Sequence, residues 1–184
     1  MINHHDPRND SGVEIPGWDS SKSHNTPALV PRLERGSYIS GFVDGEGCFC
    51  VSFHPSRRHR FGWEVRPSFS VSQNADRAQL LHILKDVWIC GSIRPDRSDK
   101  TVKFEVRCVN DLVLKVLPHF EAFPLLSSKQ ADVARFSQIC HLMFERKHLE
   151  REGFEQIVMT AMEMNPSGRR KYFAGEILRL AAIR

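Results

Sequence analysis

YISGFVDGEG, residues 38–47, is the stretch that decides the fold. Its apolar side chains recur at the spacing of one helix face: Tyr38, Ile39, Phe42 and Val43. Gly45 and Gly47 predict the end of a short helix, because glycine readily adopts the backbone conformation that terminates one. Gly41 and Gly45 stand four residues apart, so both lie on one face and would let a second helix approach the backbone very closely.

Alternating apolar and polar residues follow this helix. Residues 48–54 and 68–72 alternate strictly and predict two strands of a hairpin around a basic turn. Residues 80–87 return to helical spacing, and residues 93–107 predict a second hairpin. The order helix, hairpin, helix, hairpin predicts an α+β fold in which helices cover one face of a four-stranded antiparallel sheet.

The rest of the chain predicts helices. A short one covers residues 112–117 and is expected to end at Pro118, because proline cannot continue a helix. A longer one begins at Ser127 or Ser128 and runs to Met143, and two more cover residues 154–162 and 172–183.

The uncovered face of the sheet is expected to carry polar, short or cationic side chains. They are Ser52, His54, Arg66, Ser68, Ser70, Ser72, Arg94, Lys103, Glu105 and Arg107. A β-ribbon with this chemistry can lie in the major groove of DNA. The alternative is an ordinary solvated sheet face.

Composition sets the limits of this interpretation. The chain has 184 residues, of which 41% are hydrophobic, and this suits one globular domain. We expect a flexible arm over residues 1–33 and a folded domain over residues 34–184, because the arm is polar, proline-rich and without sustained periodicity. The formal net charge is only +4, but eleven lysines and arginines fall between residues 57 and 107, which indicates a polyanion-binding surface.

Cysteine usage and hydropathy indicate a soluble intracellular protein. The five cysteines are odd in number and widely spaced, which favours reduced thiols over a disulfide framework, and Cys48 and Cys50 have no matching pair at zinc-binding spacing. The sequence contains neither an apolar run long enough to span a membrane nor an export signal. We expect no membrane partner and a bacterial cytoplasm or an organelle as the location.

Residues 38–47 resemble the LAGLIDADG signature, with Ile39 at its first Leu, Gly41 at its first Gly, Asp44 at its first Asp and Glu46 at its last acid. The resemblance extends over roughly residues 37–165. It includes a strand ending in Gln73, a proline-rich segment followed by Lys129, and the region 145–165. The phenylalanine at position 123 stands where tyrosine is commoner. The similarity implies a homing endonuclease of the single-motif, homodimeric type.

The resemblance also implies the chemistry. Catalysis would fall to Glu46, Gln73 and Lys129, and metal ligation to Glu46 and the carbonyl of Gly45. The metal would be Mg²⁺, with Mn²⁺ or Ca²⁺ as substitutes in binding. For Gln73 the plain alternative is a strand-end polar residue, for Lys129 it is a surface lysine, and residues 44–47 alone would also fit a simple turn.

Two chains would meet through their signature helices, with the two Glu46 side chains near a twofold axis. The expected dimer interface comprises Ile39, Ser40, Gly41, Val43, Asp44 and Gly45. The expected DNA-binding residues are Cys50, Ser52, His54, Ser56, Arg57, Arg58, Arg60, Arg66, Ser68, Ser70, Ser72, Arg94, Asp96, Arg97, Lys100, Lys103, Glu105 and Arg107. A strand of about eight residues covers on the order of eight base pairs, so a dimer should read a near-palindromic site of roughly sixteen or more.

The sequence therefore predicts an intron-encoded, metal-dependent endonuclease that makes double-strand breaks in DNA. Two other hypotheses remain open. One is a binder of the same fold without cleavage, either an RNA maturase or a repressor. The other is a metal-free α+β interaction domain, which would show no salt-dependent affinity for duplex DNA.

Overall fold

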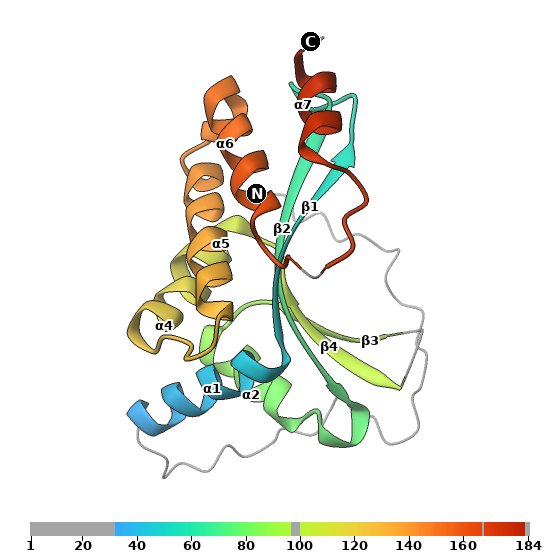
Figure 1. The fold of residues 1–184 in the computed structure, drawn as a ribbon. Coiled ribbons are helices and arrows are strands. Elements are labelled where there is room, and N and C mark those ends of the chain that lie inside the picture. Colours follow the sequence, from blue (N-terminus) through green and yellow to red (C-terminus); the bar gives the residue numbers. More distant parts are fainter. Residues whose placement is uncertain (1–31, 97–99, 167, 183–184) are drawn as a thin grey trace, which may run out of the picture.

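A four-stranded antiparallel sheet with the order β1-β2-β4-β3 forms the centre of the molecule, and helices cover one of its faces (Figure 1). The computed structural model describes residues 32–96, 100–166 and 168–182. The predicted arm, residues 1–33, lies outside this range except for Arg32 and Leu33. The α+β fold class is confirmed.

The elements begin and end as follows. They are α1 (Arg32–Glu46), β1 (Gly47–Pro55), β2 (Trp63–Asn74), η1 (Ala75–Arg77), α2 (Gln79–Trp88), β3 (Ser92–Pro95), β4 (Thr101–Val106), α3 (Val109–Asp111), η2 (Leu112–Val116), α4 (Leu117–Ala122), α5 (Lys129–Phe144), η3 (Lys147–Leu149), α6 (Arg151–Met162) and α7 (Ala174–Ala182).

The sheet register explains why one face is apolar and the other polar. Phe49 pairs with Phe69, and Phe69 pairs with Val106, so the inward positions of three strands form one row. The ring of Phe49 lies 4.9 Å from that of Phe69 and 5.4 Å from that of Phe136 on α5. Because side chains alternate along a strand, every second residue is left on the uncovered face.

Pro118 does not end a helix, contrary to the prediction. The chain passes from α3 through the π-helical turn η2 into α4, and Pro118 occupies the first turn of α4. Proline has no N–H and clashes with the carbonyl four residues earlier in a regular helix. The wider π-helical turn precedes the proline and supplies the irregular backbone that lets the helical path continue.

The C-terminal part returns to the sheet after α6. The side-chain amide of Asn165 donates to the carbonyl of Phe49 at 2.8 Å, so the segment between α6 and α7 runs along the free edge of β1. The ring of Tyr172 then packs 4.8 Å from that of Trp63. None of the helices in the described ranges is long and apolar enough to be a membrane span.

Candidate functional site

Helix α1 has a buried face and an open face. Ile39, Ser40 and Val43 are buried in the core of the protomer. Ser40 Oγ donates to the carbonyl of Phe123 at 2.6 Å. These three residues leave no surface for a second chain, so their assignment to a dimer interface is wrong: the helix turns its apolar stripe toward its own sheet.

The opposite face of α1 is open and nearly free of side chains. Gly41 and Gly45 are exposed, and a Cβ atom built at either position would meet nothing within 4 Å. Tyr38 is 63% exposed beside them. Tyr38 was counted among the apolar residues of the helix, yet it follows the spacing of the glycines, and that spacing was the available signal for its outward position.

The acidic end of α1 lies beside a lysine. Glu46 is exposed at the last position of the helix. The ammonium group of Lys129, at the start of α5, donates to the carbonyl oxygens of Asp44 at 2.6 Å and Gly47 at 2.8 Å. A cation at the end of a helix favourably meets its unpaired carbonyls. Two of the predicted catalytic residues therefore lie at one end of α1.

Gln73 reaches the same region through the sheet register. Val71 pairs with Gly47, the residue that follows Glu46, and Gln73 lies two residues further along β2. By the alternation of the strand it faces the helix side, where it is half-buried. Glu46, Gln73 and Lys129 are thus gathered from α1, β2 and α5 around the end of the signature helix.

Asp44 acts inside the protomer. Its carboxylate accepts from the backbone N–H groups of Leu126 at 3.1 Å and Ser127 at 3.0 Å, and from the Ser127 hydroxyl. The hydroxyl bond is the main reason that the pKa of Asp44 lies below its usual value. Asp44 was predicted to meet the partner chain, but the structure shows its oxygens holding the loop before α5.

One protomer offers few oxygen ligands for a metal ion. Within the described residues, no three His, Cys, Asp or Glu side chains converge in a way that could hold an ion. The exposed carboxylate of Glu46 beside the exposed backbone of Gly45 offers hard oxygen donors, which suit Mg²⁺ or Ca²⁺. Such a pair would need further ligands from outside the protomer.

The uncovered face of the sheet gathers the predicted DNA-binding residues in rows. Cys50 pairs with Ser68, Ser52 with Arg66, and Ser72 with Lys103. The outward positions, one face by the alternation of the strands, are Cys50, Ser52, His54, Arg66, Ser68, Ser70, Ser72, Arg94, Lys103 and Glu105, with Arg107 directly after β4.

The loop residues that were expected to bind DNA differ in their surroundings. Arg57 and Arg58 are exposed in the β1–β2 turn, where Ser56 Oγ bonds to a ring nitrogen of His59 at 2.8 Å. Asp96 and Lys100 are exposed at the β3–β4 turn, and Arg97 lies outside the described residues.

Arg60 and Glu105 differ from the prediction. The guanidinium of Arg60 donates to the carbonyl of Leu149 at 3.0 Å, which directs it toward η3. Glu105 is only 6% exposed and is paired with Arg94 and Arg107, so its carboxylate does not project from the face. The two-residue period of a strand predicts the face on which a side chain lies, but it does not predict the partner to which that side chain bonds.

A basic segment was missed by the sequence reasoning. Arg169, Arg170 and Lys171 lie in the segment between α6 and α7, and they line a groove of about 800 Å³ that also borders Cys50 and Lys129. Three consecutive basic residues after Gly168 were the available signal.

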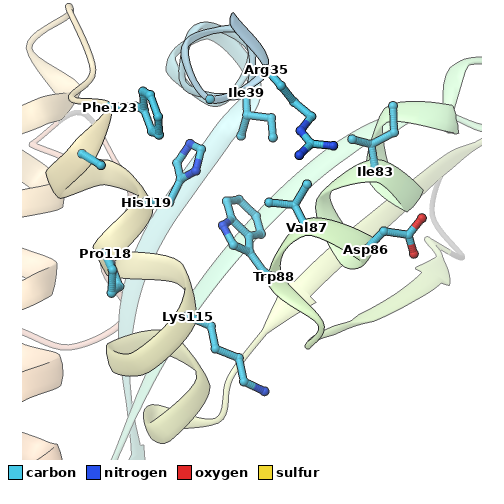
Figure 2. A pocket seen from close by; sticks show the side chains of 12 residues that line it. Arg35, Ile39, Ile83, Asp86, Val87, Trp88, Lys115, Pro118, His119 and Phe123 are labelled. Atoms are coloured by element: carbon cyan, nitrogen blue, oxygen red, sulfur yellow. The ribbon is translucent and has the colours of Figure 1, made fainter. Parts of the chain in front are cut away.

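A second cavity, of about 490 Å³, opens on the helix side between α1, α2 and α4. Figure 2 shows Trp88 of α2 facing His119 of α4, with Arg35 of α1 at the rim. Burial lowers the pKa of His119 to about 4, so the ring is neutral at physiological pH.

The family model for the LAGLIDADG endonuclease matches residues 39–140, more than half of the chain. The chain belongs to the LAGLIDADG endonuclease family. A probable intron-encoded endonuclease of Neurospora crassa is 36% identical over 130 residues, which cover 70% of this chain and 29% of the relative. The DNA endonuclease I-CeuI of Chlamydomonas moewusii is 27% identical over 66% of this chain and 56% of its own length.

Solved LAGLIDADG structures show the same fold. The homing endonuclease I-TnaI has a TM-score of 0.69 and 32% identity over 80% of this chain and 96% of its own. The archaeal intron-encoded homing endonuclease I-Vdi141I, complexed with DNA, has a TM-score of 0.75 and 25% identity over 81% and 95%. The chain spans less than two thirds of the first curated relatives that it matches.

Proposed function

We propose that this LAGLIDADG family member is a site-specific endonuclease that cuts both strands of DNA as a homodimer with divalent metal, on a long near-palindromic site. The observation that carries the proposal is the end of α1, where an exposed Glu46 lies next to a fixed lysine and an open glycine face. I-Vdi141I, of similar fold, is complexed with DNA, which supports the same substrate class here.

The open face of α1 supports the proposed homodimer. Packing of this face against its copy would bury Gly41 and Gly45 in a close helix contact and would bring two Glu46 carboxylates together at the axis. Two such carboxylates repel each other unless cations lie between them. Each protomer would thereby add its Glu46 carboxylate to the metal ligands of the other.

A bound Mg²⁺ would polarise the scissile phosphate and lower the pKa of a bound water. Glu46 and the Gly45 carbonyl are the oxygen donors that this chain offers to the metal, and Mn²⁺ or Ca²⁺ would substitute in binding. The solved I-SmaMI complex with uncleaved DNA was obtained in the presence of calcium ions. Lys129 would place positive charge near the phosphate, and Gln73 would orient water through its amide.

The uncovered face would read the DNA. β1 has nine residues and spans about 30 Å, on the order of nine base pairs for each half-site. Serines and arginines on this face can bond to base edges, and the exposed Arg57 and Arg58 can hold phosphates. The basic segment 169–171 would extend the phosphate contacts beside β1.

The decisive experiment compares Glu46→Gln with Glu34→Gln, since both acids are exposed and lie at opposite ends of α1. Each variant is incubated with a random-sequence duplex library and Mg²⁺, and cleavage products and bound duplexes are sequenced. We expect Glu46→Gln to bind and not to cut, while Glu34→Gln does both. Cleavage by Glu46→Gln at the wild-type rate would show that Glu46 is not a catalytic residue. Binding by the wild-type chain without cleavage would instead favour a maturase or a repressor.

A further inference from the structure

Glu105 is a charged residue at the centre of the face that we propose to meet a polyanion. Its side chain is 6% exposed, whereas Arg94 and Arg107 above it are 50% and 58% exposed. Burial of a carboxylate is costly unless it is paired and hydrogen-bonded. The two arginines therefore stabilise the buried carboxylate of Glu105. The carboxylate in turn acts on the two guanidinium groups.

Each oxygen of Glu105 is bonded to an arginine. Oε1 accepts from Nη2 of Arg107 at 3.1 Å, and Oε2 forms an ion pair with Nε of Arg107 at 3.0 Å. Oε2 also bonds to Nη2 of Arg94 on the neighbouring strand. These two contacts with one carboxylate restrict the orientation of the Arg107 guanidinium. The carboxylate thus joins two guanidinium groups from β3 and from the end of β4.

The surroundings leave these guanidinium groups accessible. The residues paired with Glu105 across the sheet are Ser70 and Ser92, whose side chains are too short to cover the two guanidinium groups. A guanidinium has five N–H donors, so each arginine retains several after bonding to Glu105. The cluster also keeps a net positive charge, because its two arginines outnumber the one carboxylate, and Lys103 lies on the same face.

We propose that Glu105 is a positioning residue that fixes Arg94 and Arg107 as a pair of guanine readers in the major groove. Guanine presents N7 and O6, two acceptors that suit two N–H groups of one guanidinium. An arginine held in one orientation can discriminate among bases, whereas a mobile one can settle on any phosphate. This inference rests on the proposed function, since it assigns the base preference of the same DNA-binding face.

The chain contains a matched control. Glu64 and Arg66 repeat the spacing of Glu105 and Arg107 along β2 and are bonded at 2.7 Å. Their carboxylate is 32% exposed, and its salt bridge is with one arginine. Glu64→Gln and Glu105→Gln therefore remove the same charge from two similar pairs that differ in burial.

The test is selection of bound duplexes from a random-sequence DNA pool in Ca²⁺, followed by sequencing. We expect the wild-type chain to enrich guanine at two positions of each half-site, and Glu105→Gln to lose that preference about tenfold at those positions alone. Glu64→Gln should keep it. A role in folding alone would instead reduce binding without changing the selected sequence.

Arg107→Lys provides a second variant, which keeps the charge but lacks the planar guanidinium that can bond to N7 and O6 of one guanine. We expect it to lose the preference for one of the two guanines. The inference on Glu105 is overturned if the wild type selects a sequence and both variants keep its guanines within twofold, or if the loss is uniform over all positions, as phosphate contacts would give. If the wild type enriches no sequence, the proposed function fails with it.

Discussion

The ammonium group of Lys129 lies 2.6 Å from the carbonyl oxygen of Asp44, and so the first residue of α5 closes the last turn of α1. The same group also donates to the carbonyls of Val43 and Gly47. Three acceptors hold it in place beside Glu46. A lysine ordered in this way is already positioned before any phosphate arrives.

Replacement of Lys129 by Met should impair both stability and cleavage. The variant loses charge-assisted hydrogen bonds, each worth about 1.5–3 kcal/mol, so the melting temperature should fall by several degrees. We expect the cleavage rate to fall by on the order of a hundredfold or more, since it loses a charge that stabilises the transition state. Lys147→Met, which removes an exposed lysine paired with Glu150, is the control and should leave both quantities nearly unchanged. Cleavage by Lys129→Met at the wild-type rate would show that the lysine is only structural.

Replacement of Gly41 by Leu should separate the protomers without unfolding them. The Cβ atom would enter open space, and leucine favours a helix over glycine by roughly 0.8–1 kcal/mol. The bulkier side chain prevents the close approach of two α1 helices. Light scattering should report a monomer, and double-strand cleavage should be lost. Gly175→Leu in α7, where a Cβ atom also meets nothing within 4 Å, should remain dimeric. A dimeric Gly41→Leu protein would refute this interface.

Asp44 should contribute to stability above its ordinary pKa. Its pKa in the folded protein is lowered, first by the Ser127 hydroxyl, so the contribution is lost as the pH falls through the lowered value. The free energy of unfolding of Asp44→Asn at pH 7 should be lower by about 1 kcal/mol, a modest loss because solvent partly screens this half-buried carboxylate. The difference from wild type should shrink toward pH 3 in urea titrations. An unchanged difference down to pH 3 would mean that the charge of Asp44 contributes nothing.

His119 should make the protein less stable in mild acid. Burial lowers its pKa to about 4, below the ordinary 6.5, so the unfolded chain binds more protons between these two values. The free energy of unfolding should fall as the pH drops through that window, by at most about 3 kcal/mol and by less where solvent screens the ring. His119→Gln should flatten this slope when urea unfolding is followed from pH 7 to pH 4. A slope equal to that of the wild type would assign the effect to another group.

Local patterns were sufficient for the order of elements and for the two faces of the sheet. The period of two along 48–54 and 101–107 placed the polar residues correctly, because alternation in a strand is fixed by backbone geometry. The π-helical turn before Pro118 was not predicted, since it depends on how the later helices pack. The resemblance placed Ile39 and Val43 at the dimer interface, whereas their apolar spacing already indicated an inward stripe, and both are buried in the core of the protomer.

The site residues also divide into those that local sequence patterns indicate and those that depend on tertiary contacts. The signature indicated Glu46, and spaced matches indicated Gln73 and Lys129, but the contacts of Asp44 with Ser127 and of Arg60 with Leu149 join residues more than eighty positions apart. No periodic pattern contains such pairs. Roles that depend on tertiary neighbours therefore became visible only in three dimensions.

Both outer strands of the sheet are poor templates for another strand. β3 has four residues and ends in Pro95, which has no backbone donor, and the β1 carbonyl of Phe49 is already occupied by Asn165. A chain that must keep one sheet face bare is thereby protected against edge-to-edge aggregation with its copies. Lateral growth into fibrils is discouraged, and copies are left to associate through their helices.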